Sequence, residues 1–473
     1  MTDVDRLAVA AAAAAPEFES LGRARRAGLL EQLADALEAD RSEIVGTADR
    51  ETQLGTTRLN GELTRTCYQF RLFADVIREG SYLEATIDEA AETAMGPRPD
   101  LRRMLVPLGP VAVFGASNFP LAFSVPGGDT ASALAAGCPV VVKAHPAHPE
   151  TSRRTFDAMR AVLPDGVLGL AEGFEAGADL VRHPAVKAVG FTGSAAGGRA
   201  LSDIAAARPE PIPFYAEMGS VNPVVVTAGA AASRPEEIAA GFVGSMTLGT
   251  GQFCTKPGLI FVPAGADRLR SALADAVADV AAGPMLTAGI RTAYQEEVSR
   301  RRADTRVTVL ADGKPANGDR GAAVLLAVAA EDLDGELFEE CFGPAAIVIE
   351  YRDSDELLAA LGRLEGQLTA AVHAANGETS LVQRLHGTLR AMAGRLIFDG
   401  YPTGVAVTWA MHHGGPYPAT TVASHTSVGA TSIRRWLRPV AYQNAPSSVL
   451  PDELRDGNPA GVPRRVNGTL HIA

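Results

Sequence analysis

One cysteine stands in a glycine-rich stretch near the middle of the chain, Gly249-Thr250-Gly251-Gln252-Phe253-Cys254-Thr255. A thiol attacks a carbonyl carbon only as the thiolate, and a glycine-rich loop can expose the sulfur and surround it with hydrogen-bond donors. Free cysteine is also among the most buried residue types, so this stretch alone favours a packed apolar side chain. The motifs elsewhere in the chain favour a reactive cysteine over a packed one, and we interpret Cys254 as a nucleophile.

Three further motifs precede the cysteine: Ala116-Ser117-Asn118-Phe119-Pro120, Phe191-Thr192-Gly193-Ser194 and Phe214-Tyr215-Ala216-Glu217-Met218-Gly219. With Cys254 they resemble, in order and spacing, the motifs of the aldehyde dehydrogenase superfamily. Within this superfamily, the residues are most similar to those of the α-ketoglutarate semialdehyde (2,5-dioxovalerate) dehydrogenase branch. That closer match lies in Lys143-Ala144-His145-Pro146-Ala147-His148-Pro149 and in Thr426-Ser427-Val428-Gly429 with Arg434-Arg435-Trp436-Leu437-Arg438-Pro439. The resemblance covers nearly the whole chain.

The resemblance implies a covalent oxidation of an aldehyde to a carboxylic acid. Cys254 would attack the aldehyde to give a thiohemiacetal, and the Asn118 amide and the Cys254 backbone N–H would hold its oxyanion. Asn118 could instead be a turn or helix-capping residue. Glu217 would activate the water that cleaves the thioester, and we expect its apolar surroundings to raise its pKa toward neutrality. A base at this position predicts a free acid as the product.

The resemblance also implies a nicotinamide cofactor. Lys143, which closes a buried strand, would bond the adenosine ribose, and Gly193 and Ser194 would form the pyrophosphate-binding turn at a helix N-terminus. Glu340 and Phe342 would hold the nicotinamide ribose and ring. Phe114, which closes the first strand, is predicted to contact the cofactor as well. No GxGxxG fingerprint is present, so the prediction of a dinucleotide depends on the resemblance.

The choice between NADP and NAD is predicted from Pro146. Many NAD-preferring relatives carry at this position a glutamate that would repel a 2′-phosphate, and proline cannot do so. Arg182 precedes the third strand, where related NADP-linked enzymes place an arginine, although it could also be a solvated turn residue. We therefore expect NADP to be used at least as well as NAD.

Composition limits the remaining classes of function. The chain has 473 residues, 47% of them hydrophobic, and a net charge of −12, which disfavours a nucleic-acid binder. Four scattered cysteines without CxxC spacing predict neither disulfides nor a metal site. The alanine-rich segment 7–16 indicates a helix rather than a signal peptide, and no apolar run is long enough to span a membrane. A cytoplasmic enzyme with no membrane partner is expected.

The elements that position these residues indicate an α/β protein. Apolar residues at three- and four-residue spacing predict helices up to about residue 80, and the strands 110–115 and 138–143 flank a helix, as in a parallel βαβ unit. We expect a Rossmann-type cofactor domain over 1–223, with about 85–108 contributing to an oligomerisation hairpin. An α/β catalytic domain over 224–430 and a C-terminal oligomerisation element over 431–473 follow. The resemblance implies a homodimer or homotetramer.

The substrate is less well determined than the reaction. Phe123, Phe253 and Tyr401 are candidates for lining its tunnel, and residues 394–407 are expected to form two strands around a turn over its mouth. Arg65 or Arg71 could reach a substrate carboxylate, although solvated arginines are the commoner case. Two alternatives stay open: an NADP-linked dehydrogenase of long-chain or other aliphatic aldehydes, whose tunnel would be apolar without a cationic group, and a catalytically silent structural relative.

Overall fold

A parallel sheet of five strands occupies the first half of the chain in the computed structural model, which describes residues 2–472. Its strand order is β7-β6-β5-β8-β9, and every pair is parallel. The strands are β5 (Val111–Phe114), β6 (Val140–Lys143), β7 (Leu168–Ala171), β8 (Ala188–Thr192) and β9 (Phe214–Glu217). The strand order reverses between β5 and β8, and at such a point a crevice opens at the carboxyl ends of the strands, where ligands bind.

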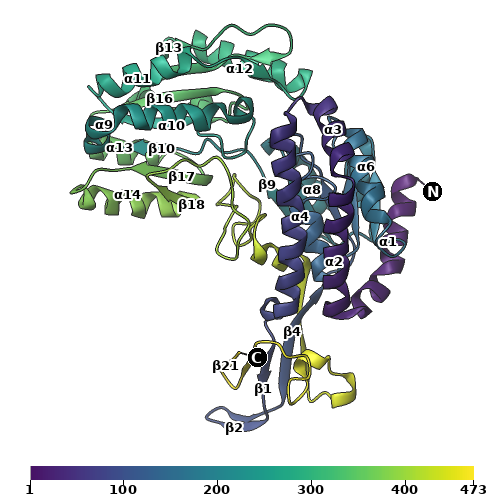
Figure 1. Cartoon of the computed structure of the whole chain (residues 1–473). Helices are drawn as coiled ribbons and strands as arrows, with labels where there is room; N and C mark the ends of the chain where they lie inside the picture. The colour runs from purple at the N-terminus through teal and green to yellow at the C-terminus, as the bar shows by residue number, and fades with distance from the viewer. Residues whose placement is uncertain (1, 473) are drawn as a thin grey trace.

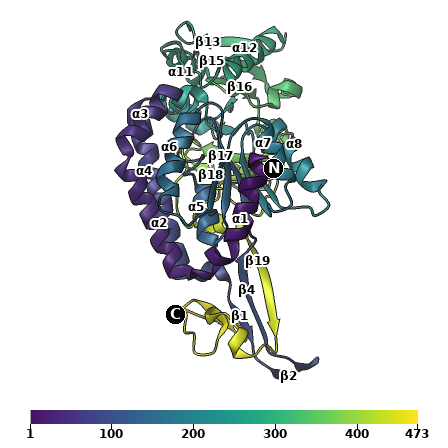
Figure 2. The ribbon, with the colours of Figure 1, turned by 90° about the vertical axis from the view of Figure 1, so that its right-hand side faces the viewer.

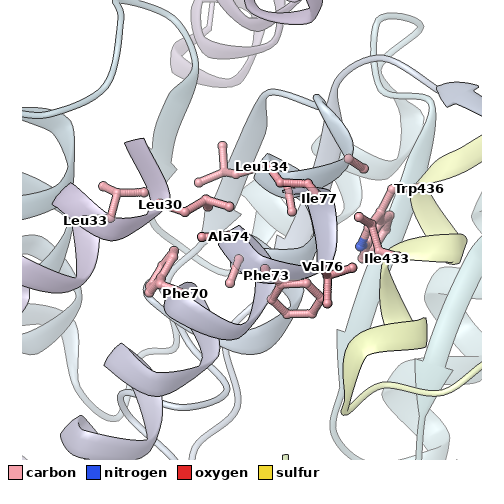
Figure 3. Packing of buried hydrophobic residues seen from close by; sticks show 14 of the residues in the cluster. Leu30, Leu33, Phe70, Phe73, Ala74, Val76, Ile77, Leu134, Ile433 and Trp436 are labelled. Carbon is pink, nitrogen blue, oxygen red and sulfur yellow. The ribbon is translucent and has the colours of Figure 1, made fainter. Parts of the chain in front are cut away.

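Helices cover both faces of this sheet (Figures 1 and 2). Those that connect its strands are α5 (Gly128–Ala136), α6 (Pro149–Arg160), α7 (Glu175–Arg182) and α8 (Ala195–Ala206). Four helices come before the sheet in the chain: α1 (Asp3–Ser20), α2 (Gly22–Ala39), α3 (Arg41–Thr52) and α4 (Thr56–Glu79). The apolar spacing that predicted these helices forms their buried faces: Leu30 and Leu33 of α2 and Phe70 and Phe73 of α4 pack in one core with Trp436 (Figure 3).

A second sheet of seven strands follows, in the order β13-β15-β16-β11-β10-β17-β18. All its pairs are parallel except β13 with β15. The strands are β10 (Val224–Val226), β11 (Leu259–Pro263), β13 (Thr308–Asp312), β15 (Val324–Ala329), β16 (Ala345–Tyr351), β17 (Gln367–His373) and β18 (Ala393–Phe398). Six helices accompany it: α9 (Ala228–Ser233), α10 (Pro235–Thr247), α11 (Asp267–Ala278), α12 (Ala288–Ala303), α13 (Ser354–Leu361) and α14 (Thr379–Met392). Two apolar cores, one on each face, hold these layers together.

A third sheet forms an arm that projects away from the other two (Figures 1 and 2). Its order is β19-β4-β1-β20-β21, so the segment predicted around 85–108 pairs with the C-terminal residues. The strands are β1 (Thr86–Asp88), β4 (Leu101–Pro107), β19 (Leu437–Gln443), β20 (Arg464–Val466) and β21 (Thr469–His471). A hairpin of β2 (Ala91–Thr93) and β3 (Gly96–Arg98) extends the arm, and β12 (Gly283–Pro284) pairs separately with β14 (Arg320–Gly321).

Short 3₁₀ helices complete the structure: η1 (Ser81–Leu83), η2 (Leu248–Gly251), η3 (Ala330–Asp332), η4 (Gly335–Phe338), η5 (Ala430–Trp436), η6 (Ser447–Val449) and η7 (Asp452–Leu454). Among residues 2–472, no helix is both long and apolar enough to cross a membrane. The cytoplasmic location stays a prediction.

The chain returns from the second sheet to the first after β18. Thr420 bridges to Glu217 at the end of β9, and the N–H of Thr421 donates to the carbonyl of Ala216. The prediction of a second strand within 394–407 is wrong, because β18 ends at Phe398 and residues 399–407 form bends and irregular backbone. Residues 399–429, called the returning segment below, therefore reach β9 as a loop without helix or strand.

Candidate active site

Cys254 lies in a tight loop that follows the 3₁₀ helix η2. Gly249, Thr250 and Gly251 all have positive φ, at 57°, 58° and 66°. A β-carbon on Gly251 would lie 2.5 Å from the backbone nitrogen of Pro344, so this close approach requires glycine. The loop leaves Cys254 half-buried, whereas the other three cysteines are buried. The glycine-rich pattern thus presents this thiol to the crevice.

Glu217 ends β9 and faces the same crevice with only 3% of its surface exposed. Its Oε2 accepts a short hydrogen bond from the Ser427 hydroxyl. Its Oε1 lies 2.9 Å from Nε2 of His413. The carboxylate is therefore held between two side chains of the returning segment.

His413 is a member of this group that the sequence analysis missed. Its Nε2 lies 3.5 Å from the sulfur of Cys254, and the side chain is 1% exposed. Its backbone N–H donates to the Thr426 hydroxyl, which fixes the loop. Among the side chains that the structure describes, Cys254, His413 and Glu217 form the one group of three His, Cys, Asp or Glu residues whose ligand-type atoms lie within 4.8 Å of one another. The paired histidines between Met411 and Gly414 were the available sequence signal.

The pKa of Glu217 differs from the sequence expectation. Burial acts to raise it, but the His413, Ser427 and Cys254 side chains outweigh burial and hold the pKa below its ordinary value. The expected rise toward neutrality is therefore wrong for the enzyme without substrate. Its cause was hidden because His413 and Ser427 lie far from Glu217 in the sequence.

The thiol of Cys254 has a pKa raised well above its ordinary value. Burial is the main cause, followed by the charge of Glu217 and a hydrogen bond with it, and Arg65 acts in the opposite direction. The sulfur therefore holds its proton at neutral pH until a neighbouring base removes it. Glu217 and His413 are the side chains placed to do so.

Asn118 follows β5 and is buried beside the Cys254 loop. One of its amide hydrogens goes to the carbonyl of Gln252 at 3.0 Å, which leaves the second available to an oxyanion. Asn222 supports the loop from the other side, because its Nδ2 donates to the carbonyl of Cys254 at 2.8 Å. Two asparagines therefore orient the backbone of the nucleophile.

The residues predicted to bind the cofactor lie at the carboxyl edge of the first sheet. Lys143 ends β6, half-buried, with a pKa lowered by burial. Phe114 ends β5 and packs under Gly177 of α7, where a β-carbon would lie 2.9 Å from its ring. Gly193 follows β8, and Ser194 caps α8 by accepting from the N–H of Gly197 at 3.2 Å. These close glycine contacts and the open N-terminus of α8 fit a dinucleotide.

Glu340 and Phe342 reach the opposite side of the crevice from the second sheet. The Glu340 carboxylate lies against Gly219, where any β-carbon would collide with it. Burial raises the pKa of Glu340 to about 7, although the nearby Lys256 ammonium opposes the rise. Lys256 itself is 2% exposed and donates to the carbonyl of Ala345 at 2.8 Å. Phe342 is half-buried in the turn before β16.

Pro146 and Arg182 lie at different ends of the first sheet. Pro146 is exposed in the turn after β6, beside the edge that Lys143 occupies. Arg182 is the last residue of α7, which runs antiparallel to the strands and leads toward the start of β8. Its guanidinium is exposed and lies 3.6 Å from Asp179. The phosphate role predicted for Arg182 is not supported, because the helix carries it to the opposite edge.

Two of the three predicted substrate residues meet around Phe119. The ring of Phe119 lies 5.3 Å from that of Phe123 and 5.1 Å from that of Phe253. Arg58 stacks over Phe119 and Phe253, and Arg65 stacks over Phe123. The aromatic group beside the Cys254 loop is therefore bordered by guanidinium groups.

Tyr401 does not join this group. Its hydroxyl donates to the carbonyl of Ile238 at 2.8 Å, and its ring lies 4.8 Å from that of His373. Both contacts belong to the packing of α10 against the second sheet. Its predicted contact with substrate is not supported, because these interactions tie the ring to the sheet.

Comparison with known proteins decides the family. The model of the aldehyde dehydrogenase family matches residues 1–415. The chain belongs to the aldehyde dehydrogenase family. It is accordingly an oxidoreductase that oxidises an aldehyde with NAD(P), as its motifs indicated.

Two full-length aldehyde dehydrogenase relatives are similar in sequence. Alpha-ketoglutaric semialdehyde dehydrogenase 2 of Azospirillum brasilense is 48% identical over 98% of this chain and 91% of its own. Alpha-ketoglutaric semialdehyde dehydrogenase of Acinetobacter baylyi is 43% identical over 99% and 92%. Among solved structures, PnpE in complex with nicotinamide adenine dinucleotide has a TM-score of 0.81 at 22% identity, covering 96% of this chain and 92% of that one. This last likeness supports the fold of an aldehyde dehydrogenase.

Proposed function

We propose that the protein oxidises α-ketoglutarate semialdehyde to α-ketoglutarate, with NADP or NAD as the oxidant. The observation that carries this proposal is the convergence of Cys254, Glu217 and Asn118 on one crevice. The two relatives of 48% and 43% identity bear the name of this substrate and match the chain over nearly its whole length. Their names supply the substrate, and the site supplies the mechanism.

The first chemical step transfers the proton of Cys254 to a neighbouring base. His413 Nε2, at 3.5 Å from the sulfur, is 2.9 Å from Glu217 Oε1, so the proton can pass to either group. The thiolate then forms a bond to the aldehyde carbon. The Asn118 amide and the backbone N–H of Cys254 hold the oxygen of the thiohemiacetal, each donor worth about 2.7–4 kcal/mol in comparable sites.

The second step leaves a thioester on Cys254. A bound nicotinamide would supply the acceptor for the hydride that leaves the thiohemiacetal carbon. Lys143, Gly193 and Ser194 would hold the adenosine half, and Glu340 and Phe342 the nicotinamide half. Glu217 then takes a proton from water, whose oxygen forms a bond to the thioester carbon. The carbon–sulfur bond breaks, Cys254 leaves as the thiolate, and the acid is released. The lowered pKa of Glu217 keeps the carboxylate ionised and able to accept that proton.

The exposed Pro146 supports use of NADP. The turn after β6 offers no carboxylate where it meets Lys143, so nothing there repels a 2′-phosphate. We propose that NADP is used at least as well as NAD. With Arg182 at the other edge, Lys143 is the cation that the predicted site supplies.

The guanidinium groups beside the aromatic side chains argue against a long-chain aliphatic aldehyde. Such a substrate needs apolar surroundings, whereas Arg58 stacks on Phe253 and Arg65 on Phe123. The presence of Cys254, Glu217, Asn118 and Lys143 argues against a silent relative. The proposal is tested by following reduced cofactor with α-ketoglutarate semialdehyde, pentanal and decanal. A kcat/KM that is higher for decanal than for the semialdehyde contradicts it.

We further propose that the arm joins two or four copies of the chain. Met95, Leu470 and Ile472 are largely exposed on it, at 99%, 57% and 83%. Exposed apolar side chains beside short edge strands are typical of a surface that another chain covers. Light scattering of the purified protein should give the mass of a dimer or tetramer, and a monomer mass would contradict this assembly.

A further inference from the structure

Helix α4 carries a line of polar side chains on the face turned toward the active site. They lie at intervals of four, three and four residues and so share one side of the helix: Arg58, Glu62, Arg65 and Gln69. Glu62 anchors this face, because its Oε1 accepts hydrogen bonds from the backbone N–H groups of Leu121 and Ala122, at 2.8 and 2.9 Å. These two residues follow the Asn118 motif directly, so α4 is fixed against the loop that holds the oxyanion.

Arg65 has two hydrogen-bond donors without acceptors. Its Nε and Nη2 are shielded from solvent and donate to no group among the described residues. Its guanidinium carbon lies 5.3 Å from the centre of the Phe123 ring. Shielded guanidinium donors without an acceptor are unfavourable, and stacking on a ring does not satisfy them. The position therefore calls for an acceptor from outside the chain.

Two other arginines near the site, Arg58 and Arg395, already donate to groups of the chain. Arg58 donates from Nη2 to the carbonyl of Asn118 at 2.6 Å and stacks on two rings. Arg395 donates from Nη1 to the carbonyl of Gly404 at 2.9 Å and from Nη2 to that of Pro402. Each is held by backbone carbonyls, which leaves Arg65 as the guanidinium with an open pair of donors beside the aromatic group.

Arg65 is also within electrostatic reach of the reacting groups. Burial lowers its pKa, and the charges of Glu62, Cys254 and Glu217 act to raise it. The interaction is mutual, since Arg65 lowers the pKa of Cys254. A ligand anchored on Arg65 would therefore extend past Phe123 toward the thiol.

We propose that Arg65 binds the carboxylate of an ω-oxo acid substrate while Cys254 attacks its aldehyde end. The open donors, Nε and Nη2, lie on the same side of the guanidinium and form the fork that a carboxylate engages through both oxygens. Phe123 and Phe253 would contact the methylene groups between the two ends. This inference rests on the proposed oxidation of a semialdehyde and assigns the residue that distinguishes it from a neutral aldehyde.

The test compares two substrates of equal chain length, α-ketoglutarate semialdehyde and pentanal, in the wild type, Arg65→Met and Arg71→Met. Arg71 lies on the same helix but pairs with Asp35 at the surface, so it serves as the matched control. The ratio of kcat/KM for the semialdehyde to that for pentanal should fall roughly tenfold or more in Arg65→Met, mainly through KM. The ratio should stay at the wild-type value in Arg71→Met.

Two other results would overturn the carboxylate role. An equal fall for both substrates would mean that Arg65 acts on the thiol, and an unchanged ratio would mean that it does not contact the substrate. Arg65→Lys keeps the charge and loses the fork, so its ratio should also fall, and this variant decides the matter if Arg65→Met does not fold.

Inhibition by glutarate separates this inference from the proposed function. Glutarate carries carboxylates and needs no oxidation, so it should inhibit the wild type competitively and inhibit Arg65→Met much less. A wild type that prefers pentanal to the semialdehyde would contradict the proposed substrate. Loss of glutarate inhibition in Arg65→Met would still support the carboxylate site in that case. Equal inhibition of both proteins would refute the site whatever the substrate.

Discussion

The carboxylate of Glu217 and the imidazole of His413 face each other at 2.9 Å, with the sulfur of Cys254 3.5 Å from the same imidazole nitrogen. Glu217 comes from the first sheet, Cys254 from the loop that precedes β11 of the second, and His413 from the segment that returns to the first. The three side chains form one proton-exchanging group, and most of the predictions concern it.

Replacing the nucleophile should abolish oxidation and leave cofactor binding intact. Cys254→Ala removes the sulfur that forms the thiohemiacetal, whereas Lys143, Gly193 and Ser194 are untouched. Reduced cofactor should fall below detection in steady-state assays, while titration of the cofactor by fluorescence gives the wild-type affinity. Cys67→Ala, in the core of α4, is the control and should retain turnover. Appreciable oxidation by Cys254→Ala would end the covalent mechanism.

Removing the charge of Glu217 should have opposite effects on two steps. Glu217→Gln deprives the hydrolytic water of its base, so a burst of reduced cofactor should precede a slow steady state, with kcat lowered roughly a hundredfold or more. The same change removes the charge that raises the pKa of Cys254, so iodoacetamide should alkylate the free enzyme faster at pH 7.5. Slower alkylation together with the absence of a burst would contradict both roles.

His413→Gln should shift the pH dependence of deacylation. The charge of His413 and its hydrogen bond lower the pKa of Glu217 against the effect of burial, so without them that pKa rises. The carboxylate then becomes protonated at a higher pH, and the acidic limb of the kcat profile should move up by about one pH unit or more. His412→Gln provides the neighbouring control. A profile that is identical in His413→Gln and the wild type would show that the imidazole does not influence the base.

Cofactor preference should depend on the turn after β6. Pro146→Glu introduces a carboxylate beside Lys143, which repels a 2′-phosphate and can accept from ribose hydroxyls, so kcat/KM should shift toward NAD by roughly tenfold. Arg182→Ala should leave the ratio unchanged, because α7 carries Arg182 to the other edge of the sheet. Kinetics with both cofactors in the three proteins supply the measurement. A lowered NADP preference in Arg182→Ala would show that Arg182 does bind the 2′-phosphate, contrary to its position in the structure.

Glu340 should make the stability of the protein depend on pH. Its pKa is raised to about 7 in the folded state, so the protonated form is favoured there and the contribution of Glu340 to the free energy of unfolding is largest below the ordinary glutamate range. That contribution is lost as pH rises from about 5 through 7. Glu340→Gln should flatten this part of the unfolding profile measured with urea at a series of pH values. If the free energy of unfolding of Glu340→Gln falls with pH as steeply as that of the wild type, a group other than Glu340 causes this pH dependence.

Local sequence patterns predicted the features that local sequence determines. The valine runs of β5 and β6 predicted a parallel sheet, and the glycines around Cys254 predicted a loop that leaves the thiol partly accessible. The roles of His413 and Ser427 were not predicted, because each contacts Glu217 from a segment far away in the chain. The open donors of Arg65 were not predicted either, since the sequence does not show which groups surround its guanidinium. The lowered pKa of Glu217 was not predicted, because it depends on these same contacts with His413 and Ser427. The phosphate role of Arg182 was predicted from its distance to Lys143 along the sequence, and that distance does not reveal the direction of α7.

The return of the chain to β9 has a consequence for biosynthesis. A ribosome releases the first sheet well before residue 413, so Glu217 and Cys254 can both fold without the loop that later joins them. Ser427, which also contacts Glu217, follows His413 in the chain. A product truncated anywhere in 399–426 would contain every strand of both large sheets yet lack part of the group around the carboxylate, so the active site is complete only after this later segment has been made.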